Sequence, residues 1–169
     1  LARARFLRCD FEGALRCCAS CTKFNPTFST AALLQAQILL RQDKDKQAHG
    51  VLEQALSHNF SVRDSPLFHL VKAKVLQTGG DAAEALEVLE GAMQLPGVST
   101  KESAGRRAAQ AATELSAFDR CSVFTQMVEV QLDLEKVGAA QATVQKAIFE
   151  FSGGPQEGRV TIANAKVEL

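Results

Sequence analysis

The sequence contains no tryptophan or tyrosine, and only 2 methionines and 4 prolines among its 169 residues. Alanine and leucine outnumber valine and isoleucine, a composition that favours helices over β-sheets. No apolar run approaches the roughly 18 residues needed to span a membrane. The 19 basic and 19 acidic residues give a net charge of zero, so no overall attraction draws the chain to nucleic acid or anionic lipid. We therefore expect neither nucleic-acid binding nor direct membrane insertion.

Cysteines are few, and their number argues against a disulfide framework. There are 5, an odd number, and 4 of them lie within residues 9–21. This pattern is more typical of a reduced, intracellular protein than of a secreted domain held by disulfides. The sequence begins with Leu1 rather than methionine, so we treat it as a fragment in which a secretory signal could not be seen.

One apolar stripe recurs along the sequence with helical spacing. Its members in one copy are Ala48, Val51, Leu52, Ala55 and Leu56. The spacing i, i+3, i+4, i+7, i+8 places them on one face of a helix. Equivalent stripes open at Ala14, Ala85 and Ala140, so the steps are 34, 37 and 55 residues. A small residue on each stripe suits close packing between helices.

A second helix precedes each stripe, and short turns join the two. Residues 30–41 and 66–77 have helical patterns, and Pro66 suits the first position of the second. Asp64 and Ser65 are both candidates for its N-cap. A pair of helices every 34 residues or so predicts an all-α fold, a helical-hairpin solenoid that winds into a right-handed superhelix and belongs to a longer array.

The predicted boundaries follow from the turns and from a segment that departs from the pattern. Residues 98–118 are rich in Ala, Ser, Thr and charge, so they predict a low-complexity insertion on the solvent side. The predicted hairpins are residues 1–27 (with a truncated first helix), 28–62, 63–97 and 119–153, followed by the first helix of another hairpin at 154–169. The predicted packing residues are Ala14, Cys18, Cys21, Ala36, Ala48, Ala55, Ala73, Ala85, Ala92, Ala140 and Ala147.

The period and the small residues resemble the tetratricopeptide repeat (TPR). In that family small residues occupy the eighth, twentieth and twenty-seventh positions, as Ala36, Ala48 and Ala55 do here. The chain departs from the pattern in three respects. The aromatic residue of the fourth position is missing, Val128 replaces a small residue, and Phe60 stands where proline is expected.

Two segments carry a more specific resemblance. AIFEFSGGPQEGRVTIANAKVEL (residues 147–169) and LEQALSHNFSVRDSPLFHLVKAKVLQ (residues 52–77) resemble segments of the tetratricopeptide repeat protein 21 family, the large TPR subunit of intraflagellar transport complex A. The resemblance implies a non-catalytic scaffold in retrograde ciliary transport and ciliary membrane protein trafficking. The implied partners are the other subunits of that complex, with the B complex and ciliary cargo as further candidates. The implied location is the cilium or flagellum and its base, on the cytoplasmic side and associated with the cytoskeleton.

The TPR pattern also implies a protein-binding groove, because the first helix of each pair lines the concave face in that family. Carried onto this sequence, the candidate groove residues are Gln37, Arg41, Leu70, Lys74, Gln77, Glu129 and Asp133. The alternative is that these polar residues only keep the surface solvated. A second candidate function, a co-chaperone-like adaptor outside the cilium that captures an acidic peptide terminus, needs a basic clamp. Only Arg41 and Lys74 could supply one, and Glu129 and Asp133 would oppose it.

The cysteine cluster is the only candidate for a metal or redox site. Four thiolates, from Cys9, Cys17, Cys18 and Cys21, could in principle hold zinc. Cys17 and Cys18 point about 100° apart on one predicted helix, which does not suit tetrahedral ligation. Packing of the cysteines as small apolar residues is the favoured interpretation. No nucleophile motif, phosphate-binding loop or metal-binding histidine pair is present, so we expect no enzyme activity, cofactor or metal.

Overall fold

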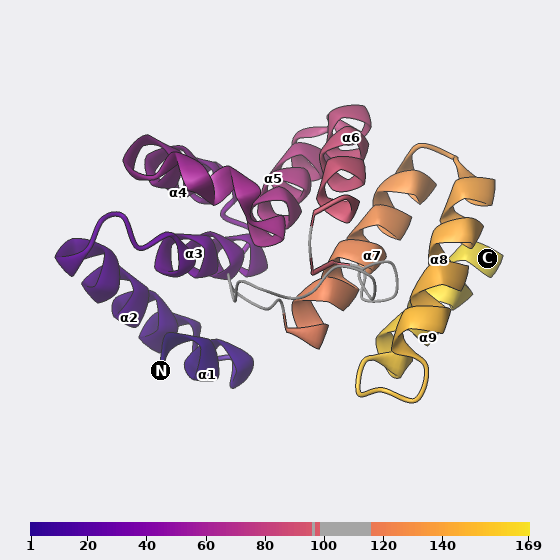
Figure 1. The fold of residues 1–169 in the computed structure, drawn as a ribbon, viewed down its shortest axis with the longest axis horizontal. Helices are drawn as coiled ribbons and strands as arrows, with labels where there is room; N and C mark the ends of the chain where they lie inside the picture. The colour runs from indigo at the N-terminus through magenta and orange to yellow at the C-terminus, as the bar shows by residue number, and fades with distance from the viewer. Residues whose placement is uncertain (96, 99–115) are drawn as a thin grey trace. The chain divides into compact units, whose positions relative to one another are not determined.

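The computed structural model describes residues 1–95, 97–98 and 116–169, and every element of these residues is helical (Figure 1). The α-helices are α1 (Ala2–Leu7), α2 (Phe11–Phe24), α3 (Ser29–Arg41), α4 (Asp45–His58), α5 (Pro66–Gly79), α6 (Ala82–Met93), α7 (Ala117–Asp133), α8 (Val137–Phe151) and α9 (Glu157–Glu168). A 3₁₀ turn, η1 (Phe60–Asp64), precedes α5. The contacts divide the chain into two units, Leu1–Gly79 and Gly80–Leu169, and each is considered by itself.

The first unit is a stack of helices in which each packs against the next. α2 contacts α1 and α3, α4 contacts α3 and α5, and α3 also contacts α5. One core cluster lies between α2 and α3 and is formed by Ala14, Cys18, Leu34 and Ile38. Two of these four side chains are small, which lets the two helices approach closely enough to exclude water from the contact.

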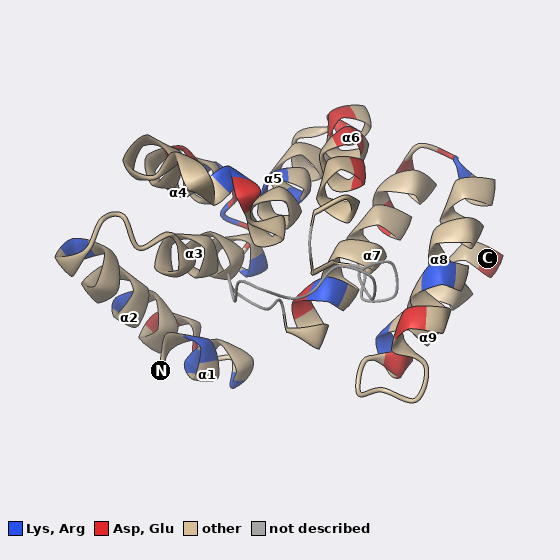
Figure 2. Ribbon diagram, in the orientation of Figure 1, with Lys and Arg blue, Asp and Glu red and all other residues tan. Residues whose placement is uncertain are grey.

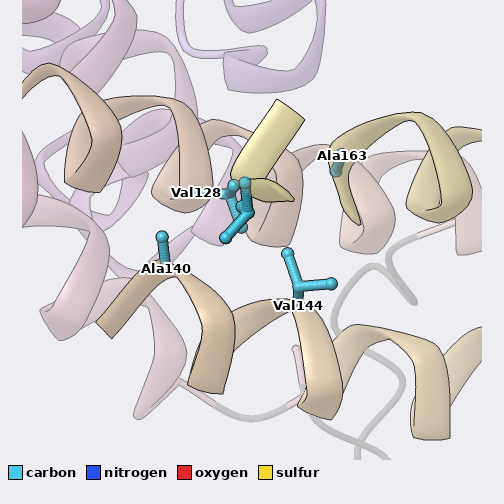
Figure 3. Packing of buried hydrophobic residues seen from close by; sticks show 5 residues of the cluster. Val128, Ala140, Val144 and Ala163 are labelled. Carbon is cyan, nitrogen blue, oxygen red and sulfur yellow. The ribbon is translucent and has the colours of Figure 1, made fainter. Parts of the chain in front are cut away.

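The second unit repeats this arrangement. α7 contacts α6, α8 and α9, and α8 also contacts α9. Val128 of α7, Ala140 and Val144 of α8 and Ala163 of α9 converge in its core, and Val167 completes the cluster (Figure 3). The all-α hairpin fold predicted from the sequence is therefore confirmed.

The turn inside each hairpin contains one residue with left-handed backbone geometry. These residues are Cys9, Asp43, Gly80 and Glu135, with φ of 60°, 55°, 95° and 57°. Their spacing matches that of the repeated alanines, since each precedes its alanine by 5 residues. Only the third is glycine, although the left-handed region disfavours residues with a Cβ atom.

Backbone hydrogen bonds show why the left-handed residue is retained. In three turns the N–H after it reaches back to a carbonyl in the last turn of the helix, and the donor–acceptor pairs are Asp10 to Arg5 (2.9 Å), Lys44 to Leu39 (3.0 Å) and Lys136 to Gln131 (2.8 Å). The preceding N–H bonds a second carbonyl, as in the Schellman motif. This motif ends the first helix of the hairpin and starts the second at a fixed angle.

The structure buries ten of the eleven predicted packing residues, and Cys21 is the exception. Cys21 is exposed, whereas its counterpart Ala55 is only 4% exposed. Ala55 lies on α4, which pairs with the 13-residue α3. Cys21 lies near the end of α2, which pairs with α1, the truncated 6-residue first helix of its hairpin. The prediction that Cys21 packs between repeats is therefore wrong.

The insertion predicted at residues 98–118 differs from the structure at both ends. Val98 is fully buried instead of facing solvent. At the other end α7 already begins at Ala117, where the Ser116 hydroxyl accepts a hydrogen bond from the N–H of Asp119 and donates one to its carboxylate. Ser116 and Asp119 are a helix-start signal. The prediction missed it because residues 98–118 are rich in Ala, Ser, Thr and charge. Residues 99–115 lie outside the described part of the chain.

We predict that Ala48→Glu and Ala85→Glu each unfold the chain. Both side chains are fully buried between helices, so a carboxylate there would have to lose its hydration, at a cost of several kcal/mol. Circular dichroism and thermal melting measure the loss. Ala83→Glu is the matched control because Ala83 lies on the exposed face of α6. Unchanged melting of the variants at 48 or 85 would refute the packing described above.

We also predict that Glu135→Gly stabilises the second unit. Glycine removes the strain of a left-handed residue, about 1–2 kcal/mol, and loses part of that gain through the greater freedom of the unfolded chain. The expected net gain is about 0.5–1 kcal/mol in urea unfolding. Gln145→Gly, on the exposed face of α8, should instead cost about 1 kcal/mol. Equal destabilisation by both glycines would show that the turn geometry is not strained.

Candidate protein-binding surface

The candidate groove residues of the first unit lie on α3 and α5. Gln37 is half-buried, and Arg41 is exposed in the last turn of α3. On α5, the Lys74 ammonium donates a hydrogen bond to the Gln77 side-chain carbonyl at 3.1 Å. Both side chains are half-buried, and each makes a further interaction. Of these four, Arg41 is the one whose side chain is mostly accessible to a partner.

The TPR pattern implied that Leu70 is exposed in the groove. The structure buries it instead. It is only 8% exposed, and Leu33 and Leu67 at related positions are also buried. The reason is that α3 and α5 pack directly against each other. Large apolar side chains on that side of the helices therefore form part of the contact between repeats instead of a recognition surface. Leu70 is accordingly a packing residue.

In the second unit, one of the two predicted groove acids joins two helices. The Glu129 carboxylate of α7 accepts a hydrogen bond from the Lys166 ammonium of α9 at 2.9 Å. Asp133 is exposed one turn further along α7. The ion pair is partly exposed, so its contribution to stability is small, about 0–1 kcal/mol. The Glu129 carboxylate is therefore engaged in a contact between neighbouring repeats, which makes it less available to an external partner.

Arg159 of α9 joins two helices of the second unit. The sequence patterns did not single out this residue. Its guanidinium donates to the Phe118 backbone carbonyl at 3.1 Å and to the Ser122 hydroxyl at 3.0 Å. It also lies over the Phe118 ring at 4.4 Å from the centroid. A planar guanidinium makes these contacts at once, so Arg159 fixes α9 against the first turns of α7. The only sequence signal was its place in the segment that resembles the family.

A second arginine joins α7 to α8. Arg120 forms an ion pair with Glu150 at 3.2 Å, and the two side chains are 17% and 5% exposed. The Arg120 guanidinium also lies 5.7 Å from the centre of the Phe151 ring. Arg120 therefore connects α7 to α8, which is a structural role.

Charge is unevenly distributed along the chain although the total is zero. Lys and Arg are prominent on α1 and α2, while Asp and Glu are prominent on α6 (Figure 2). The acidic residues of the α6 region are Asp81, Glu84, Glu87 and Glu90, all exposed. No lysine or arginine occurs between residues 79 and 98. The basic α1 and α2 would attract acidic partners, and the acidic α6 would attract basic partners.

A cavity of about 610 Å³ lies between α1, α2 and α3 in the first unit. Its lining is mostly apolar and includes Cys17, Cys21 and Leu34, and Arg3 and Arg16 also contribute. It offers apolar contact and positive charge.

The cysteines differ in burial and in acidity. Cys18 and Cys121 are buried, whereas Cys9 and Cys21 are exposed and Cys17 is intermediate. Burial, together with the nearby Cys21 and Cys17, raises the pKa of the Cys18 thiol to about 11. Burial also raises the pKa of Cys121, against a smaller opposing effect of Arg159. Within the described ranges, no group of three His, Cys, Asp or Glu side chains is arranged to hold a metal ion.

We predict that iodoacetamide at pH 7.5 modifies Cys9 and Cys21 in the folded chain and leaves Cys18 and Cys121 unmodified. A buried thiol with a raised pKa is neither accessible nor ionised, and the thiolate is the reactive form. Peptide mass spectrometry with and without urea measures the difference, and all 5 cysteines should react in urea. Protection of Cys9 and Cys21 by added zinc, lost in Cys18→Ser, would instead indicate a metal site.

The helical hairpins packed within each unit define a helical-repeat scaffold. Comparison with known families gives the class a more specific identity. The family model described as "Tetratricopeptide repeat protein 21 ARM repeat" matches residues 60–169, and "Tetratricopeptide repeat protein 21 second ARM domain" matches residues 1–43. The chain belongs to the tetratricopeptide repeat protein 21 family.

Curated relatives agree with this assignment. The chain is 41% identical to mouse tetratricopeptide repeat protein 21B over 170 aligned residues, 38% identical to the human 21B protein and 36% identical to mouse 21A. These alignments cover 99–100% of this chain but only 12–13% of each relative. The chain therefore spans about an eighth of the length of those proteins.

A solved structure supports the fold independently. The crystal structure of MamA matches with a TM-score of 0.57, covering 99% of this chain and 92% of that chain at 12% sequence identity. At that identity the likeness concerns the fold alone. Across the described residues, no helix is both long enough and apolar enough to cross a membrane.

Proposed function

We propose that the chain is a non-catalytic scaffold segment of intraflagellar transport complex A, which mediates protein–protein contacts in retrograde ciliary transport and ciliary membrane protein trafficking. The observation that carries the proposal is membership of the tetratricopeptide repeat protein 21 family over the whole chain. The cellular role follows from the resemblance given above, in which this family is the large TPR subunit of the complex. The partners are other subunits of that complex, and the location is the cilium and its base.

The geometry is consistent with a scaffold because the side chains best suited to chemistry have other roles. Arg159 and Arg120 hold α9 and α8 against α7, and the Cys18 thiol is buried within the repeat contact. Rigid helices that present different side chains on an extended surface provide separate contacts for several partners. Exposed groove residues such as Arg41 and Asp133 are the first candidates for those contacts.

An experiment in ciliated cells tests this proposal through Arg41. In the full-length protein, we expect Arg41→Glu to lower co-purification of the other complex subunits several-fold, because the reversed charge repels whatever the arginine contacts. The melting temperature should stay within about 2 °C because the side chain is exposed. Lys46→Glu reverses an exposed charge on α4 and is the matched control.

Crosslinking mass spectrometry on the intact complex gives the complementary evidence. Crosslinks from this segment to other subunits of the complex are expected, and their complete absence would count against the proposal. Binding of a chaperone C-terminal peptide at micromolar concentration, abolished by Lys74→Ala, would favour the adaptor function instead. The Lys74–Gln77 hydrogen bond makes that outcome unexpected, since the ammonium already has a partner within its own helix.

A further inference from the structure

One face of α2 lines the cavity between α1, α2 and α3. The spacing of its members is i, i+3, i+4, i+7, i+8, which is a single stripe on a helix. The members are Gly13, Arg16, Cys17, Ser20 and Cys21. The stripe lies beside the one through which Ala14 and Cys18 pack in the core. It brings two thiols, one turn apart, to the wall of a mostly apolar cavity.

The two thiols of this stripe can be reached from solvent. Cys21 is exposed and Cys17 is intermediate in burial. Cys18 is buried, and its pKa is raised to about 11 by burial and, to a smaller extent, by the nearby Cys21 and Cys17. Cys9 is also exposed, but it does not line the cavity. Comparison with Cys9 therefore separates the effect of accessibility from the effect of the cavity.

The cavity has the size and the lining of a small-molecule site. Its volume is about 610 Å³, and sites for small ligands measure about 300–1,000 Å³. Phe28, Ala31 and Leu34 contribute apolar wall on the side of α3. Phe28 is 47% exposed, so part of a large aromatic side chain faces water. An apolar chain that enters the cavity would cover this surface.

The charged side chains that line the cavity are all basic. They are Arg3, Arg5 and Arg16, and among the lining residues that the structure describes none is Asp or Glu. The sequence has no acidic residue between Glu12 and Asp43. Lys and Arg are accordingly prominent on α1 and α2 (Figure 2). A ligand that complements this cavity has a long apolar chain and an anionic group.

Arg5 is fixed against the start of α2. Its guanidinium donates a hydrogen bond to the Asp10 carboxylate at 3.1 Å. Gly13 makes room for this pair, since a Cβ atom at that position would clash with both side chains. The pairing with Asp10 reduces the charge that Arg5 offers to a ligand. Arg16, which is exposed on α2, is therefore the arginine chosen for the test below.

We infer that the cavity is an S-acylation site, in which a long-chain acyl-coenzyme A acylates Cys21, with Cys17 as a second acceptor, and the acyl chain lies against Phe28 and Leu34. The cysteine sulfur attacks the thioester carbonyl carbon. A C–S bond to the cysteine forms, the C–S bond to coenzyme A breaks, and coenzyme A leaves as a thiol that takes up the proton of the cysteine. The phosphates of coenzyme A complement the arginines. The inference does not depend on the proposed cellular role.

Transfer from two donors to the 169-residue chain tests the inference. With palmitoyl-coenzyme A at neutral pH, peptide mass spectrometry should find Cys21 and Cys17 acylated about tenfold or more above Cys9, because burial of about two methylenes already supplies that factor. Acetyl-coenzyme A lacks the long chain and should show a much smaller preference. Equal acylation of Cys9 by the palmitoyl donor, or the same preference with both donors, would overturn the inference.

Variants of the cavity provide a second test. Thr30 lines the cavity from an exposed position, so Thr30→Trp should fill it and lower palmitoylation several-fold. Reaction of Cys21 with iodoacetamide should stay unchanged in this variant. Gln54→Trp, on the exposed face of α4, is the matched control. Arg16→Gln should slow transfer from palmitoyl-coenzyme A by a few-fold. Unchanged palmitoylation in Thr30→Trp would overturn the inference.

The full-length protein in cultured cells provides a third test. Metabolic labelling with an alkyne analogue of palmitate should place the label on the peptide that contains Cys17 and Cys21. Hydroxylamine cleaves thioesters and should remove it. The double variant Cys17→Ser, Cys21→Ser should lose the label from this peptide, whereas Cys9→Ser should keep it. An unlabelled peptide in the unmodified protein would contradict the inference.

Discussion

Close approach of helices at small side chains is the constraint on which this structure depends. Ala14, Ala48, Ala85 and Ala140 are all fully buried, and each donates its backbone N–H to the residue four positions earlier in the first turn of its helix, at 3.0 Å. A larger side chain at these positions would separate the helix axes and open the contacts beside them. The other contacts, including the arginine bridges of the second unit, become possible only once the helices are this close.

The turn geometry lets the same contact between two helices recur along the chain. A left-handed residue and two reverse hydrogen bonds end the first helix of the hairpin at the same place relative to the alanine of the second. Three of the four left-handed residues carry a side chain, so the turns bear strain that glycine would avoid. The surrounding packing outweighs that strain, since each turn is held by the two helices that it joins.

The sequence predicted the parts of the fold that follow from periodicity and missed those that depend on neighbours. The alanine stripes predicted the helices and their buried faces because the stripe itself is what the repeat contact requires. Cys21 was misplaced because the helix that faces α2 is short, and Leu70 because α3 and α5 pack directly against each other. The exposed side of the groove could not be deduced from position alone, as α3 and α5 cover leucines that the TPR pattern leaves open.

The polar side chains were harder still to interpret, because their roles depend on contacts between distant segments. Arg159 contacts residues 118 and 122, and Asn59 contacts Thr27, so no local pattern in the sequence marks either interaction. Both join one repeat to the next, through a guanidinium in one case and an amide in the other. Side chains that bridge repeats at fixed geometry limit how far the stack can flex. In a helical-repeat stack that limit fixes the surface that the repeats present, and the same side chains would be poor candidates for direct recognition.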